Sequence, residues 1–328
     1  MSRGLLVVAS VIVSACTVQR WQPVSSAALD DHLSHMSAAD MRAPQMIHDA
    51  RSGAMQGTPG LPPSALSAEA RLKASPRHAE WVKIAWEPGS RDSLMAWVVY
   101  PARRGKAPVV VVVHEIFGLS TWVRGVADQV AADGFIAIAP DLESRVRGGP
   151  STTELSGDSA RKLIAGVDIP ERNRGIAAAA KYAMSQPSAE QRYGIIGYCW
   201  GGSTVWGHVI HGGSGLAAGV AFYGSVPYMN GAVPVGDSLA KIQVPVMLLN
   251  GSKDARIGAS MPAVDSTMKS LGKNYSGTNY EGAEHGFLRA QDDQKQPRDP
   301  ATEAANLAAA REGWPKTVAF LKRNLGVK

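Results

Sequence analysis

Five consecutive valines, Val109–Val113, are the feature of this sequence that most restricts its fold. β-Branched side chains favour extended backbone, and a strand without alternating polar residues is buried on both faces. Such strands occur in parallel sheets that carry helices on both sides. The run therefore predicts the central strand of an α/β fold.

The chain from about residue 77 onward alternates between strand-like and helix-like segments. Trp81–Trp86 and Ser93–Pro101 are expected to pair antiparallel, and a long polar excursion spans Leu142–Ile169. Further strands are expected at Phe135–Asp141, Tyr193–Cys199, Leu216–Gly224, Val244–Gly251 and Asn274–Gly282, and helices at Trp122–Asp133, Pro170–Ser185, Cys199–Ile210, Pro262–Leu271 and Pro300–Leu325. This alternation predicts a mostly parallel central sheet flanked by helices on both faces, with its ligand site at the carboxyl ends of the strands.

The amino terminus has the pattern of an export signal over residues 1–16. Arg3 supplies a positive start, Gly4–Val13 is an apolar core too short to span a bilayer, and Val13–Cys16 is similar to the cleavage motif of bacterial lipoproteins. Two interpretations stay open. In the one we favour, Cys16 is lipidated and attaches an exported, periplasmic protein to a membrane. In the other, ordinary cleavage nearby leaves a soluble periplasmic or secreted protein.

Residues 17–76 have the composition of an N-terminal extension, and residues 77–328 are expected to form the catalytic domain. Gly57–Ser67 is rich in proline and glycine, which favours a linker. Three methionines and three histidines of the extension would suit copper, but their spacing lacks a regular repeat, so we interpret this stretch as a spacer: Met36, Met41, Met46, His32, His35 and His48. The net charge of +6 comes without a dense basic cluster, so nucleic acid is not expected as a partner.

The second cysteine, Cys199, lies in the segment IIGYCWGGS, between a strand and a helix. It could be a buried spacer, half of a disulfide, a metal ligand or a nucleophile. Cys16 belongs to the export signal and no His/Cys cluster is apparent, so we exclude a disulfide framework and expect no metal. The G-x-C-x-G pattern matches the strained turn that presents a catalytic nucleophile, and it aims the N–H of Trp200 at a developing oxyanion.

Two further residues turn this weak pattern into a specific one. Asp254 follows one expected strand and His285 follows the last one, so both fall at the same sheet edge as Cys199. The chain order of nucleophile, acid and histidine is that of α/β-hydrolases. We therefore predict a catalytic triad of Cys199, Asp254 and His285.

The motifs over residues 80–325 resemble those of the dienelactone hydrolase family of α/β-hydrolases. The matching segments are GYCWGG at Gly197–Gly202, EIFG at Glu115–Gly118, APDL at Ala139–Leu142 and EHGFLR at Glu284–Arg289. The resemblance implies that Glu115 takes the proton of the cysteine when substrate arrives, and that the N–H of Ile116 completes the oxyanion hole.

The resemblance also implies that two arginines bind a substrate carboxylate. Arg289 matches one of them, whereas Gly157 stands at the ungapped position of the other. Arg161 or Arg147 could replace it, or the substrate could lack the carboxylate. Tyr198, beside the nucleophile, is a further candidate for substrate contact.

The sequence therefore predicts an enzyme that hydrolyses carboxylic esters or lactones through an acyl-enzyme on Cys199. The expected partner is a small ester or lactone, anionic if the arginines bind a carboxylate, and no cofactor is assigned. The alternatives are a general esterase, thioesterase or peptidase on the same scaffold, and a non-catalytic envelope protein, against which the complete triad argues.

Overall fold

The computed structural model describes residues 57–86, 89, 92–151, 155, 157–226, 229–230, 233–234, 236–291 and 299–327. The expected export signal with Cys16, and the methionine- and histidine-rich part of the extension, lie outside these residues. Within them, no helix has the length and apolar character that crossing a membrane requires.

Eight strands form one sheet in the order β1-β2-β4-β3-β5-β6-β9-β10, with only β2 running against the others. The strands are β1 (Ala79–Ala85), β2 (Ser93–Val99), β3 (Ala107–Val113), β4 (Ile136–Asp141), β5 (Ala189–Tyr198), β6 (Leu216–Phe222), β9 (Val246–Gly251) and β10 (Tyr275–Tyr280). All seven residues of β3 are buried, as its valine run predicts. The expected antiparallel pair and parallel sheet are confirmed.

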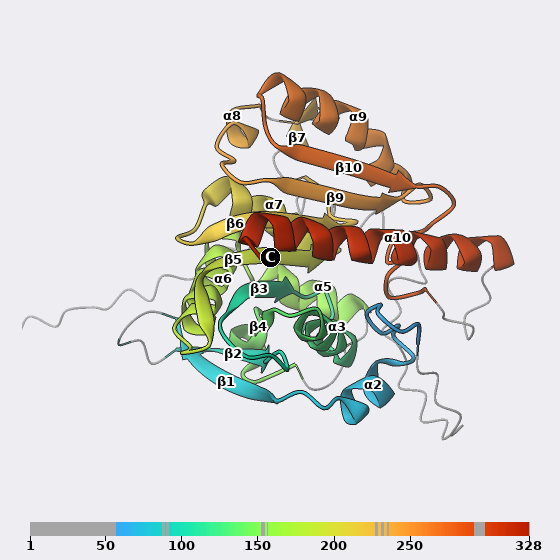
Figure 1. Cartoon of the computed structure of the whole chain (residues 1–328). Coiled ribbons are helices and arrows are strands. Elements are labelled where there is room, and N and C mark those ends of the chain that lie inside the picture. The colour runs from blue at the N-terminus through green and yellow to red at the C-terminus, as the bar shows by residue number, and fades with distance from the viewer. Residues whose placement is uncertain are drawn as a thin grey trace, which may run out of the picture.

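Helices cover both faces of the sheet (Figure 1). The longer ones are α3 (Thr121–Ala132), α6 (Ile169–Met184), α7 (Trp200–His211), α9 (Ala255–Ser270) and α10 (Pro300–Leu325), and the shorter ones α2 (Ala68–Ala74), α4 (Ser144–Arg147), α5 (Gly157–Ala165) and α8 (Gly236–Leu239). Two glycines of β5 show the layering: Gly194 faces Leu321 of α10, whereas Gly197, on the opposite face, lies against α7. This is the α/β-hydrolase architecture that the sequence predicts.

Three local expectations were incomplete. The polar excursion contains α4 and α5, and a two-stranded ribbon pairs β7 (Met229–Asn230) with β8 (Val233–Pro234). Helix α9 begins directly after Asp254 and holds Pro262 in its interior, whereas the sequence favours a start at that proline. A proline inside a helix removes one backbone hydrogen bond, which the packing of buried Ile257, Met261 and Val264 offsets.

The segment Gly57–Ser67, interpreted above as a linker, packs against the α/β domain. Its Leu61 is 4% exposed, Trp122 of α3 donates from Nε1 to the Pro63 carbonyl at 2.8 Å, and the Ala65 N–H donates to the Arg289 carbonyl at 3.0 Å. Residues 61–64 are buried between two turns, and the carbonyls of Pro62 and Pro63 accept hydrogen bonds from the side chains of Gln291 and Trp122.

Candidate active site

Cys199 lies on a strained turn between β5 and α7. Its backbone has φ 56° and ψ −119°, a conformation that L-residues rarely adopt. A Cβ at Gly197 would collide with the Gly201 carbonyl, and one at Gly201 would collide with the carbonyls of Val113 and His114. The flanking glycines therefore let the first turn of α7 approach the ends of β5 and β3, as a nucleophile elbow requires.

The thiol of Cys199 is enclosed, since the residue is only 1% exposed. Burial raises its pKa above the ordinary value, against the charge and hydrogen bond of His285, which lower it, and the carboxylate of Glu115 adds to the increase. The backbone N–H of Trp200 also lies within hydrogen-bond distance of the sulfur. A thiol with a raised pKa is protonated at neutral pH, so it needs a base before it can attack.

The structure brings the predicted acid and histidine together at the same sheet edge. Asp254 follows β9, His285 follows β10, and His285 Nδ1 lies 2.6 Å from Asp254 Oδ2 with both side chains almost fully buried. Burial lowers the pKa of His285, but the negative charge that Cys199 carries as a thiolate and the hydrogen bond with Asp254 outweigh this and raise the pKa well above its usual value. His285 contacts both partners and is suited to move protons between the sulfur and bound substrate.

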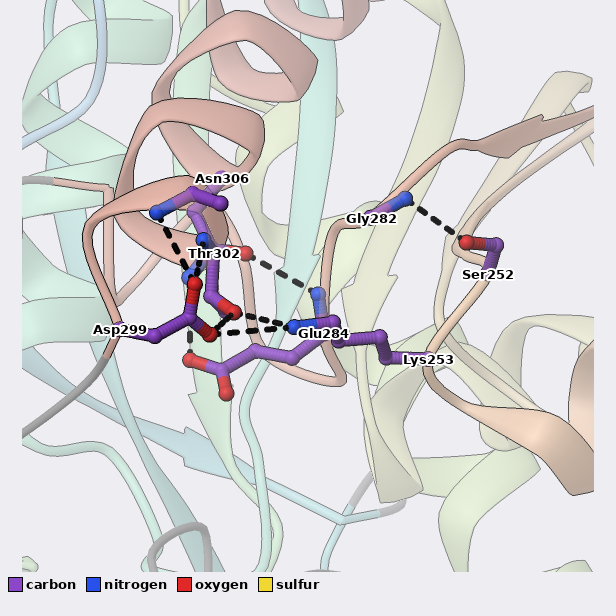
Figure 2. A network of polar contacts seen from close by, with 8 residues as sticks. Ser252, Lys253, Gly282, Glu284, Asp299, Thr302 and Asn306 are labelled. Atoms are coloured by element: carbon purple, nitrogen blue, oxygen red, sulfur yellow. Dashed lines mark hydrogen bonds and ion pairs between the residues drawn. The ribbon is translucent and has the colours of Figure 1, made fainter.

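A polar network ties the loops that carry Asp254 and His285 to the start of α10 (Figure 2). Ser252 accepts a hydrogen bond from the Gly282 N–H at 2.8 Å. Asn306, which is fully buried, accepts from the Glu284 N–H and donates to the Glu284 side chain, both at 3.0 Å. Lys253 reaches Asp299 and Thr302 at the α10 N-terminus. The residues next to the acid and the histidine are thus held to one helix end.

Glu115 follows β3 and faces Arg289 rather than solvent. Its Oε2 lies 3.6 Å from Arg289 Nε, and the side chains are 6% and 13% exposed, respectively. The guanidinium of Arg289 also lies 5.1 Å from the ring of Phe117. Because the charge of Glu115 acts on the thiol of Cys199, the carboxylate and its arginine belong to the same site as the triad.

The two predicted oxyanion donors come from neighbouring segments. Ile116 is fully buried in the loop after β3, and Trp200 opens α7, whose first turn rests against the end of β3. The N–H groups of Ile116 and Trp200 are therefore candidates for a shared oxyanion site beside the sulfur.

The remaining predicted substrate contacts, Arg161, Arg147 and Tyr198, have partners other than the triad residues. Arg161, on α5, lies 3.7 Å from Asp158 of the same helix, and Arg147 lies 3.6 Å from Glu143. Tyr198 is fully buried, with its ring 5.0 Å from Trp122, and its pKa is raised well above the usual value by burial and by Glu115. Tyr198 thus packs beneath the elbow, where the charge of Glu115 adds to the increase of its pKa.

Sequence reasoning missed two residues of this site. Tyr223, after β6, has φ 38° and is fully buried, with its ring 5.0 Å from that of His285. His114 precedes Glu115, and its ring stacks on Trp200 at 5.3 Å. The positive φ of Tyr223 has no sequence signal, whereas the position of His114 next to a candidate acid could have drawn attention to it.

The comparisons with known proteins decide the family. The model of the dienelactone hydrolase family matches residues 94–325, which include every residue described above as part of the site. The chain belongs to the dienelactone hydrolase family. It is therefore a hydrolase of the ester and lactone type. Within its described parts, no group of three or more His, Cys, Asp or Glu side chains could hold a metal ion.

Similar proteins support the same assignment. The chain is 31% identical to a "Putative carboxymethylenebutenolidase" of Methylorubrum extorquens over 63% of this chain and 71% of that protein. It is 27% identical to a protein of the same name in Escherichia coli, over 82% and 97% of the two chains. A crystal structure of a "Putative Dienelactone Hydrolase" from Klebsiella pneumoniae superposes with a TM-score of 0.61 at 24% identity, over 75% and 99% of the chains, which supports the shared fold.

Proposed function

We propose that this protein hydrolyses carboxylic esters or lactones through a covalent acyl-enzyme on Cys199. The observation that carries the proposal is the convergence of an elbow cysteine with the Asp254–His285 pair and with a buried carboxylate, Glu115. One nucleophile with two separate proton-accepting groups is what acyl transfer by a protonated thiol needs.

The first half-reaction begins when Glu115 accepts the proton of the Cys199 thiol as substrate binds. The freed sulfur attacks the carbonyl carbon, and the N–H groups of Ile116 and Trp200 stabilise the negative oxygen of the tetrahedral intermediate. His285, whose pKa is raised, is protonated and donates that proton to the leaving oxygen. The alcohol departs, or in a lactone the ring opens, and the acyl group stays on sulfur.

The second half-reaction restores the starting protonation states of Cys199, Glu115 and His285. Neutral His285, oriented by Asp254, takes a proton from water, and the resulting hydroxide attacks the thioester. The tetrahedral intermediate collapses, the sulfur leaves and recovers its proton from Glu115. The carboxylic acid product is released and His285 is again protonated.

The charges around Glu115 support an anionic substrate. Arg289 is a largely buried cation 3.6 Å from Glu115, so we propose that it binds a substrate carboxylate, with Arg161 as the candidate for a second contact and Tyr198 in the supporting wall. Substrate binding to Arg289 would release Glu115 from its ion pair at the moment when a base is needed. Carboxymethylenebutenolidase, the name borne by the relatives, fits this anionic class.

The decisive assay compares wild type, Cys199→Ala and Glu115→Gln on p-nitrophenyl acetate and on a dienelactone. Wild type is expected to turn over the dienelactone, and Cys199→Ala to show only the background rate. Equal background rates for wild type and Cys199→Ala on every ester would contradict the proposal. Turnover of the simple ester alone would favour a general esterase.

We also propose that the protein is exported and held to a membrane by a lipid on Cys16. The basis is the motif Val13–Cys16 after an apolar segment. The full-length protein expressed in a bacterial host is expected to partition into detergent, and Cys16→Ala to release it into the aqueous phase. A wild-type protein that is unmodified and freely soluble would contradict the anchor.

A further inference from the structure

His114, the residue before Glu115, lies at the contact between the two segments that carry the oxyanion donors. It follows β3 directly, is fully buried, and uses both ring nitrogens. Nδ1 lies 2.6 Å from the carbonyl oxygen of Glu115, and Nε2 lies 3.1 Å from the backbone nitrogen of Leu142. The ring is thus fixed at both of its polar atoms.

These partners determine the protonation of the ring. A carbonyl oxygen only accepts, so Nδ1 carries the hydrogen, and the Leu142 N–H donates to an unprotonated Nε2. The pKa of His114 is lowered, chiefly by burial, which agrees with a neutral ring. With both nitrogens engaged and no exposed surface, His114 has no atom with which to exchange a proton with substrate.

The first of these hydrogen bonds acts on the peptide group that supplies one oxyanion donor. The carbonyl of Glu115 and the N–H of Ile116 belong to the same planar unit, and the described residues contain no cis peptide bond. The carbonyl and the N–H therefore point in opposite directions, so anchoring the oxygen fixes where the hydrogen points. A donor on the carbonyl also polarises the N–H and strengthens it as a donor.

The ring of His114 also contacts Trp200, the residue whose backbone N–H is the second oxyanion donor. It stacks on the indole of Trp200 with centroids 5.3 Å apart and planes 19° apart, and the guanidinium of Arg172 lies 4.5 Å from the same indole. The indole nitrogen has no hydrogen-bond partner among the described residues, so these ring contacts orient the side chain. The first turn of α7 also approaches the His114 carbonyl so closely that a Cβ at Gly201 would not fit.

We infer that His114 is a positioning residue for the oxyanion hole. It fixes the N–H groups of Ile116 and Trp200 in the relative orientation that lets both donate to the same oxygen. The inference rests on the proposed function, because only acyl transfer develops charge on a carbonyl oxygen. It predicts that loss of the Nδ1 donor impairs acyl transfer while leaving the reactivity of the sulfur itself intact.

The test measures acyl transfer and the reactivity of the sulfur on the same substituted enzymes. Alkylation of Cys199 by iodoacetamide needs the thiolate but no oxyanion hole, whereas ester hydrolysis needs both. His114→Phe keeps a ring against Trp200 but has no donor, and His114→Asn places an amide N–H near the position of Nδ1. Steady-state kcat and KM on p-nitrophenyl acetate are measured beside the alkylation rate of the Cys199 peptide, followed by mass spectrometry.

For His114→Phe we expect kcat to fall about 10- to 100-fold, less than the loss from removing a donor outright, with KM and the alkylation rate changed less than about threefold. His114→Asn should recover most of kcat. The matched control is His208→Phe: His208 is also fully buried and hydrogen-bonded through both nitrogens, to Tyr193 at 2.7 Å and Asn173 at 3.2 Å. It should be destabilised similarly and keep its kcat.

Three results would overturn the inference and leave the proposed function in place. Unchanged kcat in His114→Phe would show that the hydrogen bond is dispensable, and parallel loss of hydrolysis and alkylation would place the effect on the sulfur. If His114→Phe does not fold, a folded His114→Asn enzyme with a kcat about 10- to 100-fold below that of wild type would count against the inference. A wild type that hydrolyses no ester instead contradicts the proposed function, and this inference with it.

Discussion

Arg289 Nε lies 3.6 Å from Glu115 Oε2 in a setting where both side chains are almost wholly buried. A buried ion pair of this kind costs desolvation energy, which its own attraction only partly offsets. The pair is therefore poorly explained by stability alone. It fits the proposed exchange, in which a substrate carboxylate would take over the arginine and leave Glu115 free to act as a base.

The exchange predicts a charge-selective effect of Arg289→Gln. Charge-assisted hydrogen bonds contribute about 1.5–3 kcal/mol, so kcat/KM for a carboxylate-bearing lactone should fall about 10- to 100-fold. A neutral ester of similar size should lose less than about threefold. Arg161→Gln in the same pair of assays measures how much the second candidate arginine contributes to binding the substrate carboxylate. Equal losses on both substrates would contradict carboxylate binding by Arg289.

Glu115→Gln should separate turnover from thiol reactivity. The glutamine cannot accept the proton of Cys199, so ester turnover should fall about 10²- to 10⁴-fold. The carboxylate adds to the raised pKa of the thiol, and its removal should shift the pH dependence of Cys199 alkylation to lower pH. Alkylation rates measured across the pH range test this. Unchanged turnover, or a shift to higher pH, would contradict the assigned role.

Asp254→Asn should leave the structure intact and damage the chemistry. The carboxylate accepts from His285 Nδ1–H at 2.6 Å, whereas an amide nitrogen in its place favours the wrong tautomer. The equivalent change in a serine triad lowers kcat about 10⁴-fold, and a loss of about 10²- to 10⁴-fold is expected here. Thermal unfolding provides the control, and wild-type kcat in a folded Asp254→Asn protein would remove the aspartate from the triad.

Much of the fold and the triad could be predicted from the sequence because short stretches of the chain indicate them. The valine run marks β3, the glycines around Cys199 mark a turn that larger residues cannot form, and Asp254 and His285 follow strand ends. Residues of this kind reveal their role through their neighbours in the chain.

Other parts depend on tertiary contacts that a sequence does not display. Gly57–Ser67 has the composition of a linker, yet Trp122 and the backbone of Arg289 hold it on the domain. The role inferred for His114 arises from its contacts with Leu142 and Trp200, which are distant in the chain. The identity of a second carboxylate-binding arginine likewise depends on how the polar excursion Leu142–Ile169 folds.

A buried carboxyl outside the triad predicts a pH-dependent stability. Burial, together with Asp141, raises the pKa of Glu143 from 4.5 to about 8, although Arg147 acts in the opposite direction. The folded protein then binds more protons than the unfolded chain between these pH values, so its stability falls as pH rises, by at most about 1.4 kcal/mol per unit from this group.

Glu143→Gln should flatten that dependence. The amide stays neutral, so the variant should gain thermal stability relative to wild type at pH 8 and much less at pH 5. Unfolding curves of both proteins at the two pH values measure the difference. A constant difference at the two values would show that Glu143 does not carry the proton.

The proposed mechanism requires that Cys199 become acylated during turnover. Its most direct test is intact-protein mass spectrometry after rapid acid quenching of the enzyme mixed with p-nitrophenyl acetate, followed by peptide mapping. We expect one added acetyl group on the peptide that contains Cys199, formed at least as fast as turnover and absent from Cys199→Ala. Turnover by wild type without an acetylated Cys199 at any quench time, together with equal turnover by Cys199→Ala, would contradict it.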